Sequence, residues 1–145
     1  MTNVSKIEEF LSSVDKLFPV PLSEKHNLTE FATKLAEKAT ICSACENGKI
    51  VSMVAGYTEN IIDNIAYISI VASLPSTQGK GYATSLLKKF IQICNEKSIN
   101  AVHLYTAKTN SVAVKMYEKL GFVKWTLPNE ARPADLHLIY RIGEN

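Results

Sequence analysis

The N-terminal part of the chain carries two helical patterns. Apolar residues recur at helical spacing over Val4–Leu17 and predict a first helix, which Pro19 and Pro21 end. Asn27–Glu30 resembles a capping box and predicts the start of a second helix. The apolar stripe of that helix consists of Leu28, Phe31, Leu35 and Ala39.

Strand patterns follow. Asn47–Gly48 is the strongest turn signal in the chain, because a type I′ turn needs two residues that tolerate positive φ. It joins predicted strands over Ala39–Cys45 and Lys49–Tyr57. A further β-rich run, Ala66–Ala72, comes before Pro75.

The second half alternates helices and strands. Helical stripes predict helices over Gly81–Lys97 and Asn110–Gly121, with a short strand at Ala101–Thr106 between them. Two strands, Phe122–Thr126 and Asp135–Ile142, finish the chain. Helices between strands, with a hairpin at the start, predict a mixed α/β (α+β) fold and a single domain over 1–145.

Length and charge narrow the function classes. The chain has 145 residues, 46% of them hydrophobic, which suits one compact core. Sixteen Lys and Arg against fourteen Asp and Glu give a formal charge of +2, too balanced for a surface that binds nucleic acid or anionic lipid. No stretch approaches the 18 apolar residues of a membrane span, and residues 1–10 lack the basic region and apolar run that are typical of a signal peptide. We therefore expect a cytoplasmic protein without nucleic-acid or membrane partners, in which any anion is held locally.

The cysteines do not indicate a disulfide framework or a metal site. Cys42, Cys45 and Cys94 are odd in number. Cys42 and Cys45 form a CxxC motif, but they lie on a predicted strand, where residues three apart point to opposite faces. With no second CxxC and no nearby His, we expect strand packing and no metal.

The segment Pro75–Thr84 carries the clearest chemical signal. It lies between a strand and a helix start, and Gly79 and Gly81 leave backbone N–H groups unobstructed. Such a loop suits a pyrophosphate, with Lys80 adding charge at the rim. A flexible turn that caps the helix is the alternative on spacing alone.

Two other phosphate-binding motifs fit poorly. A P-loop needs Gly-Lys-Ser/Thr at its end, whereas Tyr82 follows Gly81. A dinucleotide fingerprint needs Gly or Ala where Thr84 stands and an acid about 20 residues on, and the region Asn100–Thr106 has none.

Two motifs carry a family resemblance. Gln78–Ala83 reads Gln-x-x-Gly-x-Ala, and Asn110–Phe122 follows at the expected separation. Together they resemble the GNAT superfamily of acetyl-CoA-dependent N-acetyltransferases, closely over Ala66–Phe122. The resemblance implies a central mixed, mostly antiparallel sheet that is splayed at the cofactor cleft and flanked by helices.

The same resemblance implies how acetyl-CoA is held. The cleft would lie between the strands that end near Ser73 and Thr106. The pantetheine arm would pair with the backbone of one strand, the pyrophosphate would lie on the glycine-rich loop, and the residue that begins the next helix would contact the cofactor arm. These cofactor-binding residues are Val71, Ala72, Ser73, Gln78, Gly79, Lys80, Gly81, Tyr82, Ala83, Thr84 and Asn110.

Tyr117 matches the family's general acid, which protonates the departing thiolate. Without the motif, a buried aromatic residue is the plainer interpretation of this Tyr. Because the acetyl group is already activated as a thioester, the enzyme mainly aligns it with a neutral amine and stabilises the oxyanion.

The general base is not identified by the resemblance. Many relatives place a Glu five residues before the Asn, and this chain has Tyr105 there, which we expect at the acceptor-side wall. His103 shares a strand face with Tyr105 and is a candidate base, although a packed or surface His is as consistent with the pattern. His137, on the last strand, is a second candidate on the same grounds.

The resemblance implies an acyltransferase that moves an acetyl group from acetyl-CoA to a primary amine in a ternary complex. The helix over Val4–Leu17 and the connection Pro19–His26 are expected over the acceptor side. Short members of similar layout act on small amines or amino sugars, so we expect such an acceptor. A protein N-terminal or ribosomal-protein acetyltransferase and a non-catalytic acyl-CoA sensor stay open, and a homodimer is compatible with the sequence.

Overall fold

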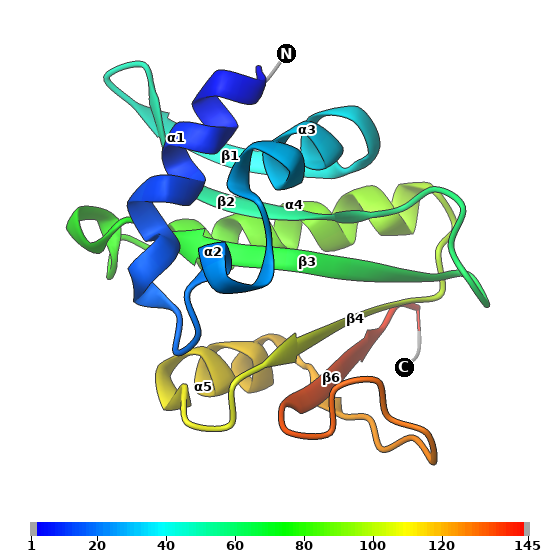
Figure 1. The fold of residues 1–145 in the computed structure, drawn as a ribbon. Helices are drawn as coiled ribbons and strands as arrows, with labels where there is room; N and C mark the ends of the chain where they lie inside the picture. Colours follow the sequence, from blue (N-terminus) through cyan, green and yellow to red (C-terminus); the bar gives the residue numbers. More distant parts are fainter. Residues whose placement is uncertain (1–2, 144–145) are drawn as a thin grey trace.

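The computed structural model describes residues 3–143, and its centre is a six-stranded sheet with the order β1-β2-β3-β4-β6-β5 (Figure 1). Neighbouring strands are antiparallel except β3 and β4, which are parallel. The strands are β1 Thr40–Glu46, β2 Lys49–Tyr57, β3 Ile65–Ser73, β4 Ala101–Thr106, β5 Val123–Lys124 and β6 Leu136–Arg141.

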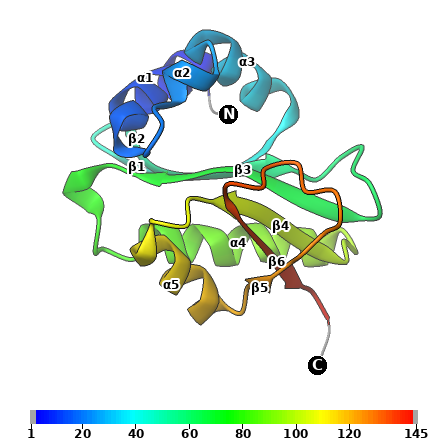
Figure 2. The same cartoon turned by 60° about the horizontal axis from the view of Figure 1, so that its bottom comes forward.

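Helices cover both faces of the sheet. In Figure 2, α1, α2 and α3 lie on one face, and α4 and α5 lie on the other. No helix of residues 3–143 is long and apolar enough to cross a membrane. The helices are α1 Val4–Val14, α2 Leu22–Lys25, α3 Leu28–Lys38, α4 Tyr82–Glu96 and α5 Ser111–Leu120, with 3-10 turns η1 Asp15–Leu17 and η2 Pro75–Thr77.

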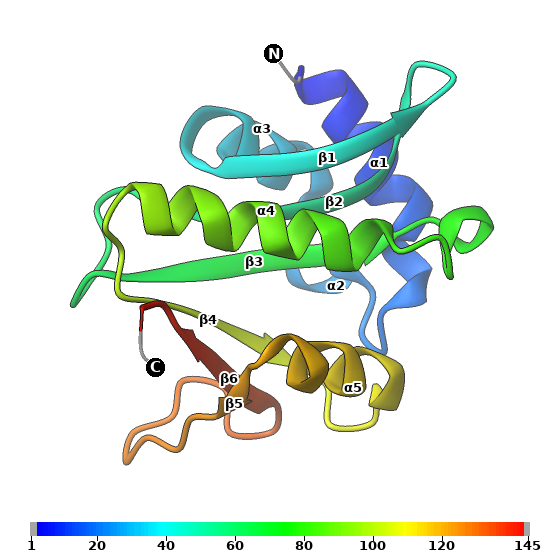
Figure 3. The same cartoon turned by 180° about the vertical axis from the view of Figure 1, so that it is seen from behind.

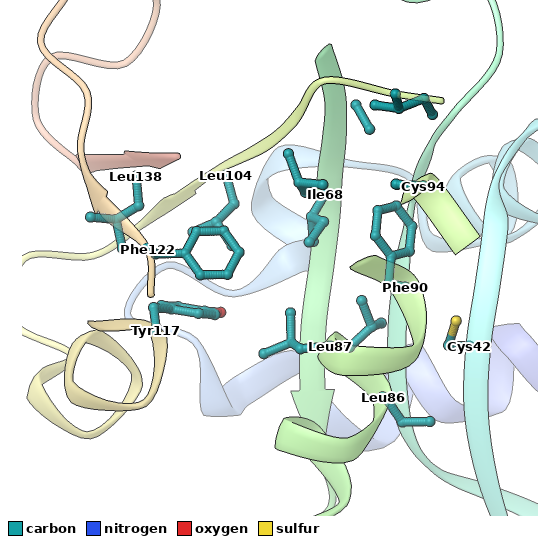
Figure 4. Packing of buried hydrophobic residues seen from close by; sticks show 14 residues of the cluster. Cys42, Ile68, Leu86, Leu87, Phe90, Cys94, Leu104, Tyr117, Phe122 and Leu138 are labelled. Carbon is teal, nitrogen blue, oxygen red and sulfur yellow. The ribbon is translucent and has the colours of Figure 1, made fainter. Parts of the chain in front are cut away.

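Each helical layer packs on its own hydrophobic core. Phe10 and Leu11 of α1 pack with Met53 of β2 on one face. On the other face, Phe90 of α4 is fully buried against Ile68 of β3, and the cluster extends to α5 and β6 (Figure 4). The sheet is thus sandwiched between two helical layers, as a mixed fold with a single sheet requires.

The predicted elements are largely confirmed, with differences at three places. The α-helix of the first segment ends at Val14, and Asp15–Leu17 is a 3-10 turn. The four-residue helix α2 was not predicted, since it is too short to show a periodic stripe. The strand expected over Phe122–Thr126 is reduced to Val123–Lys124, because β5 is an edge strand that pairs with β6 only there.

The sheet opens between β3 and β4. These strands pair only at Ile65–Ala101, Ala66–Val102 and Tyr67–His103, and beyond these pairs they diverge (Figures 1 and 3). A β-bulge in β3 accompanies the opening, because Ala55 is opposite Ile70 whereas Gly56 is opposite Ile68. The expected sheet, splayed at one point, is therefore confirmed.

Candidate active site

A cleft of about 870 Å³ occupies the gap between β3 and β4. One end is lined by β3, the glycine-rich loop, and the starts of α4 and α5. The other end is lined by η1, the connection to α2, and residues that follow β5. The cleft therefore runs continuously from the loop expected to bind the cofactor to the side expected to bind the acceptor.

The open edge of β3 presents backbone polar groups to the cleft. The Leu74 N–H donates to the Val51 carbonyl at 2.8 Å, on the β2 side. Because the direction alternates along an antiparallel strand, Ala72 also faces β2, whereas Val71 and Ser73 direct their backbone groups into the gap. Gln78 Nε2 donates to the Ser73 carbonyl at 3.4 Å on that side. Val71 and Ser73 are thus placed to pair with an extended ligand.

The glycine-rich loop is shaped by two left-handed residues. Gly79 has a φ of +87° and Gly81 a φ of +81°, and a Cβ added at either would meet nothing within 4 Å, so backbone conformation alone selects glycine. Gly81 is the N-cap of α4, and no side chain caps the helix. The first N–H groups of α4 therefore stay available to an anion, and the residues present fit a pyrophosphate.

A carboxylate from β1 braces the same loop. Lys80 Nζ lies 3.3 Å from Glu46 Oε2, and the Tyr82 hydroxyl donates to that oxygen at 2.7 Å. The hydrogen bonds from Tyr82 and Lys80 hold the pKa of Glu46 below its ordinary value. Lys80 thus points toward Glu46 instead of into the cleft, and nothing in the local sequence predicts this contact across 34 residues.

The residues from α5 lie on the opposite wall of the cofactor end. Asn110 is the N-cap of α5 and accepts the Ala113 N–H at 3.3 Å, and it also lines the cleft. Tyr117 is 5% exposed, lines the cleft, and packs edge-on against Phe122 with ring centroids 5.6 Å apart (Figure 4). Burial raises the pKa of the Tyr117 hydroxyl, so it keeps its proton at neutral pH.

The expectation that His103 and Tyr105 share one face of β4 is confirmed. Tyr105 lines the cleft, and its ring stacks on His137 of β6 with centroids 4.0 Å apart. His103 lies behind it, with Nδ1 2.7 Å from His137 Nε2. Burial, with the neighbouring His137, lowers the pKa of His103 to about 4, so it is a weak proton acceptor at neutral pH.

Glu130 joins this group and was not predicted from the sequence. It lies in the connection between β5 and β6, where it accepts a short hydrogen bond from the Tyr105 hydroxyl. Its second oxygen lies 2.8 Å from His137 Nδ1. The hydrogen bonds from Tyr105 and His137 hold the pKa of Glu130 below its ordinary value, so it is ionised at neutral pH.

The acceptor end of the cleft is mainly apolar and aromatic. As expected, the connection Pro19–His26 lines this end, but of the first segment only Leu17 of η1 does so, and α1 does not line the cleft. His26 stacks on Phe31 with centroids 4.6 Å apart. Asp135 lines the rim, where it is paired with Arg132 at 2.5 Å. Among the described lining residues, Asp135 is the only carboxylate.

The cysteines behave as expected, since Cys42 is buried and Cys45 is exposed on the opposite face of β1. No group of three or more His, Cys, Asp or Glu within residues 3–143 is placed to hold a metal ion.

Comparison with known proteins agrees with this geometry. Residues 7–122 match the model of the acetyltransferase (GNAT) family. Mycothiol acetyltransferase of Arthrobacter sp. (strain FB24) is 36% identical over 61 residues, which cover 42% of this chain and 19% of that protein. N-alpha-acetyltransferase 30 of Xenopus laevis is 41% identical over 58 residues, 40% of this chain and 21% of that protein. The matched segment is thus about a fifth of the length of these relatives.

The fold is also shared with solved structures. The PaiA N-acetyltransferase from Thermoplasma acidophilum, in complex with coenzyme A, superposes with a TM-score of 0.71 at 16% identity over 95% of this chain and 92% of that chain. The family match spans most of the chain and includes both motifs. The chain therefore belongs to the GNAT family of acetyltransferases.

Proposed function

We propose that the protein transfers the acetyl group of acetyl-CoA to the primary amine of a small molecule, an amine or an amino sugar, by direct attack in a ternary complex. The observation that carries the proposal is the continuous cleft between β3 and β4, with backbone N–H groups at one end and a mainly apolar wall at the other. Both reactants fit into one cleft, so the acetyl group need not rest on the enzyme.

The cofactor end supports acetyl-CoA. Two oriented glycines and the uncapped start of α4 suit the pyrophosphate, and the edge of β3 at Val71 and Ser73 suits the amide-containing pantetheine arm. A backbone N–H at that edge would polarise the thioester carbonyl. Tyr117, protonated and at the cleft wall, is the proposed proton donor to the departing sulfur.

The acceptor end of the cleft supports a small molecule with one amine as the acceptor. The connection from η1 to α2 covers this end, which restricts the length of an acceptor that enters. The single lining carboxylate of the described residues, Asp135, is already paired with Arg132. A polycation would find no free carboxylates along this wall, whereas a neutral ring carrying one amine would pack on the aromatic side chains.

Two measurements test the proposal. Calorimetric titration should show acetyl-CoA binding to the folded protein. Release of CoA thiol should then be followed with ethanolamine, glucosamine, spermidine and a short peptide with a free N-terminus. We expect turnover with ethanolamine or glucosamine. Turnover of the peptide alone would favour a protein N-terminal acetyltransferase, and binding without turnover of any amine would favour an acyl-CoA sensor.

A further inference from the structure

We propose that Tyr105 takes the proton from the acceptor amine and passes its own hydroxyl proton to Glu130, whose carboxylate is held by His137 and, behind it, His103. The inference rests on the proposed transfer to an amine and names the proton path of that reaction. Tyr105 is the catalytic residue that touches the acceptor. Glu130 and His137 act through it.

Tyr105 is placed to take the proton from the acceptor. It lies two residues beyond Tyr67–His103, the last parallel pair of β3 and β4, and therefore at the point where the sheet opens. Its ring is fixed between His137, with centroids 4.0 Å apart and planes 17° from parallel, and the Arg132 guanidinium, 5.3 Å from the ring centre. These contacts hold the hydroxyl in one place on a residue that lines the cleft.

The two hydrogen bonds to Glu130 have fixed directions. An ionised Glu130 only accepts, so the Tyr105 hydroxyl must donate to one of its oxygens and His137 Nδ1–H to the other. His137 Nε2 lies 2.7 Å from His103 Nδ1, so one of these two nitrogens donates to the other. Because the only hydroxyl proton of Tyr105 points to Glu130, its lone pairs are left to accept a proton from a ligand in the cleft.

The surrounding charges fit a path through the phenol. The groups that face this chain are Arg132, which is paired with Asp135, together with Tyr67 and Trp125. Burial and the hydrogen bond to Glu130 raise the pKa of Tyr105 to about 12, so the phenolate form of Tyr105 is not populated at neutral pH. The proton must therefore move through Tyr105 to Glu130 in one concerted shift.

The step balances. The acceptor ammonium gives one proton to the Tyr105 oxygen while the phenol proton moves to Glu130 Oε1. The freed nitrogen lone pair forms the C–N bond to the acetyl carbon, and the carbonyl π pair moves to oxygen. The carbonyl then re-forms, the C–S bond breaks with its electron pair on sulfur, and Tyr117 protonates the sulfur and regains a proton from the second N–H of the nitrogen. Glu130 returns its proton to water, so the ammonium and the thioester give one amide, one thiol and one released proton.

The pH dependence of a Glu130→Gln variant tests this path. With the best amine of the panel, we expect kcat/KM at pH 7 to fall about 100-fold, within the usual range for loss of a general base. The deficit should shrink to less than about 10-fold near pH 9.5, because an alkyl amine with a pKa near that of Lys increasingly loses its proton to water. A structural role alone would give a ratio that does not change with pH.

Further variants keep the test decisive if Glu130→Gln folds poorly. Tyr105→Phe should show a similar loss and a similar recovery with pH, and the double variant should lose little more than either single one, because the two groups act as a unit. Glu59→Gln, an exposed carboxylate paired with Lys97, and Tyr140→Phe, on β6 but outside the cleft lining, are matched controls that should keep wild-type activity.

A readout without substrate is also available. A long-range proton–nitrogen NMR spectrum of the free protein should show His137 with its proton on Nδ1 at neutral pH, and Glu130→Gln should change that signal while leaving His26 unaffected. Normal activity of Tyr105→Phe, or a loss in Glu130→Gln that is constant with pH, would overturn the inference. If no amine of the panel is acetylated, the proposed function fails first, and the proton path with it.

Discussion

The two ends of the cleft differ in whether backbone or side-chain groups line them. The end proposed for the cofactor is mostly backbone, namely the open edge of β3, the left-handed glycines and the start of α4. The end proposed for the acceptor is mostly side chains, which come from η1, the connection to α2, β4 and the connection between β5 and β6. The first end depends on a short local motif, whereas the second depends on which distant segments the fold brings together.

This difference explains the modest charge of the chain. Backbone N–H groups at a helix start bind phosphate without a basic surface, so a formal charge of +2 is compatible with an anionic cofactor. Near the acceptor end, Glu130 is hydrogen-bonded to Tyr105 and His137, Asp135 is paired with Arg132, and Lys25 also lines the cleft. The described carboxylates there are thus already partnered.

The largest expected effect concerns the bulge where the cleft opens. In Gly56→Ala the new Cβ would clash with the Tyr67 carbonyl oxygen and lie 2.9 Å from the Ile68 Cα, both backbone atoms. We expect the free energy of unfolding to fall by about 3 kcal/mol, as overpacking does, measured by urea denaturation. Gly48→Ala, in an open turn, should cost only about 1 kcal/mol for its positive φ. A Gly56→Ala variant as stable as wild type would show that the bulge is not tightly packed.

The next largest effect is expected at Gly81, where a substitution should affect only the cofactor end of the cleft. Gly81→Asp places a carboxylate beside the uncapped N–H groups of α4, where it competes with and repels phosphate. We expect acetyl-CoA affinity to fall about 100-fold by calorimetry, equivalent to one strong hydrogen bond to a charged group. Gly48→Asp, at the far hairpin, is the control for added charge. Retained affinity in Gly81→Asp would rule out this loop as the pyrophosphate site.

A smaller effect is expected at Tyr117. Burial raises the pKa of the Tyr117 hydroxyl, so Tyr117 is still protonated when the thiolate forms and can donate to it as proposed. Tyr117→Phe should therefore lower kcat about 10-fold, the value of one charge-assisted hydrogen bond, with the Kd of acetyl-CoA unchanged. Steady-state kinetics and calorimetry measure the two quantities separately, and an unchanged kcat would remove Tyr117 from the acid role.

The smallest effect is expected at Lys80. Its ammonium is half-exposed and already paired with Glu46, so its charge is partly neutralised and screened. Lys80→Ala should weaken acetyl-CoA binding no more than about 3-fold, in line with exposed ion pairs. The calorimetric Kd at low and at physiological salt checks this. A loss of 30-fold or more would mean that Lys80 leaves Glu46 to bind phosphate, and that the cofactor end relies on side-chain charge.

The sequence predicts the elements with strong local signals. The strands Lys49–Tyr57 and Ala101–Thr106 agree with the structure at both ends. The left-handed conformation of both loop glycines was not predicted, but it is one that glycine readily adopts. Hydrophobic periodicity, turn chemistry and helix starts are properties of neighbouring residues, so a single sequence contains them.

The acceptor end was only partly predictable for the same reason. The alternation along β4 placed His103 and Tyr105 on one face, but no local pattern connects Tyr105 to Glu130, 25 residues away. The contact of Glu46 with Lys80 and Tyr82 likewise depends on the strand order of the sheet. The cleft roles assigned to Val71, Ser73, Asn110 and Tyr117 stay predictions until a ligand is bound.

Amide chemical-shift mapping of acetyl-CoA binding tests the central claim most directly, because it reports both ends of the cleft at once. The largest shifts should fall on Val71–Ser73, Gln78–Thr84 and Asn110, with small changes at Phe18, His26 and Arg132 on the acceptor side. Shifts concentrated on the connection from η1 to α2, with residues 78–84 unaffected, would contradict the assignment of the backbone-built end to the cofactor.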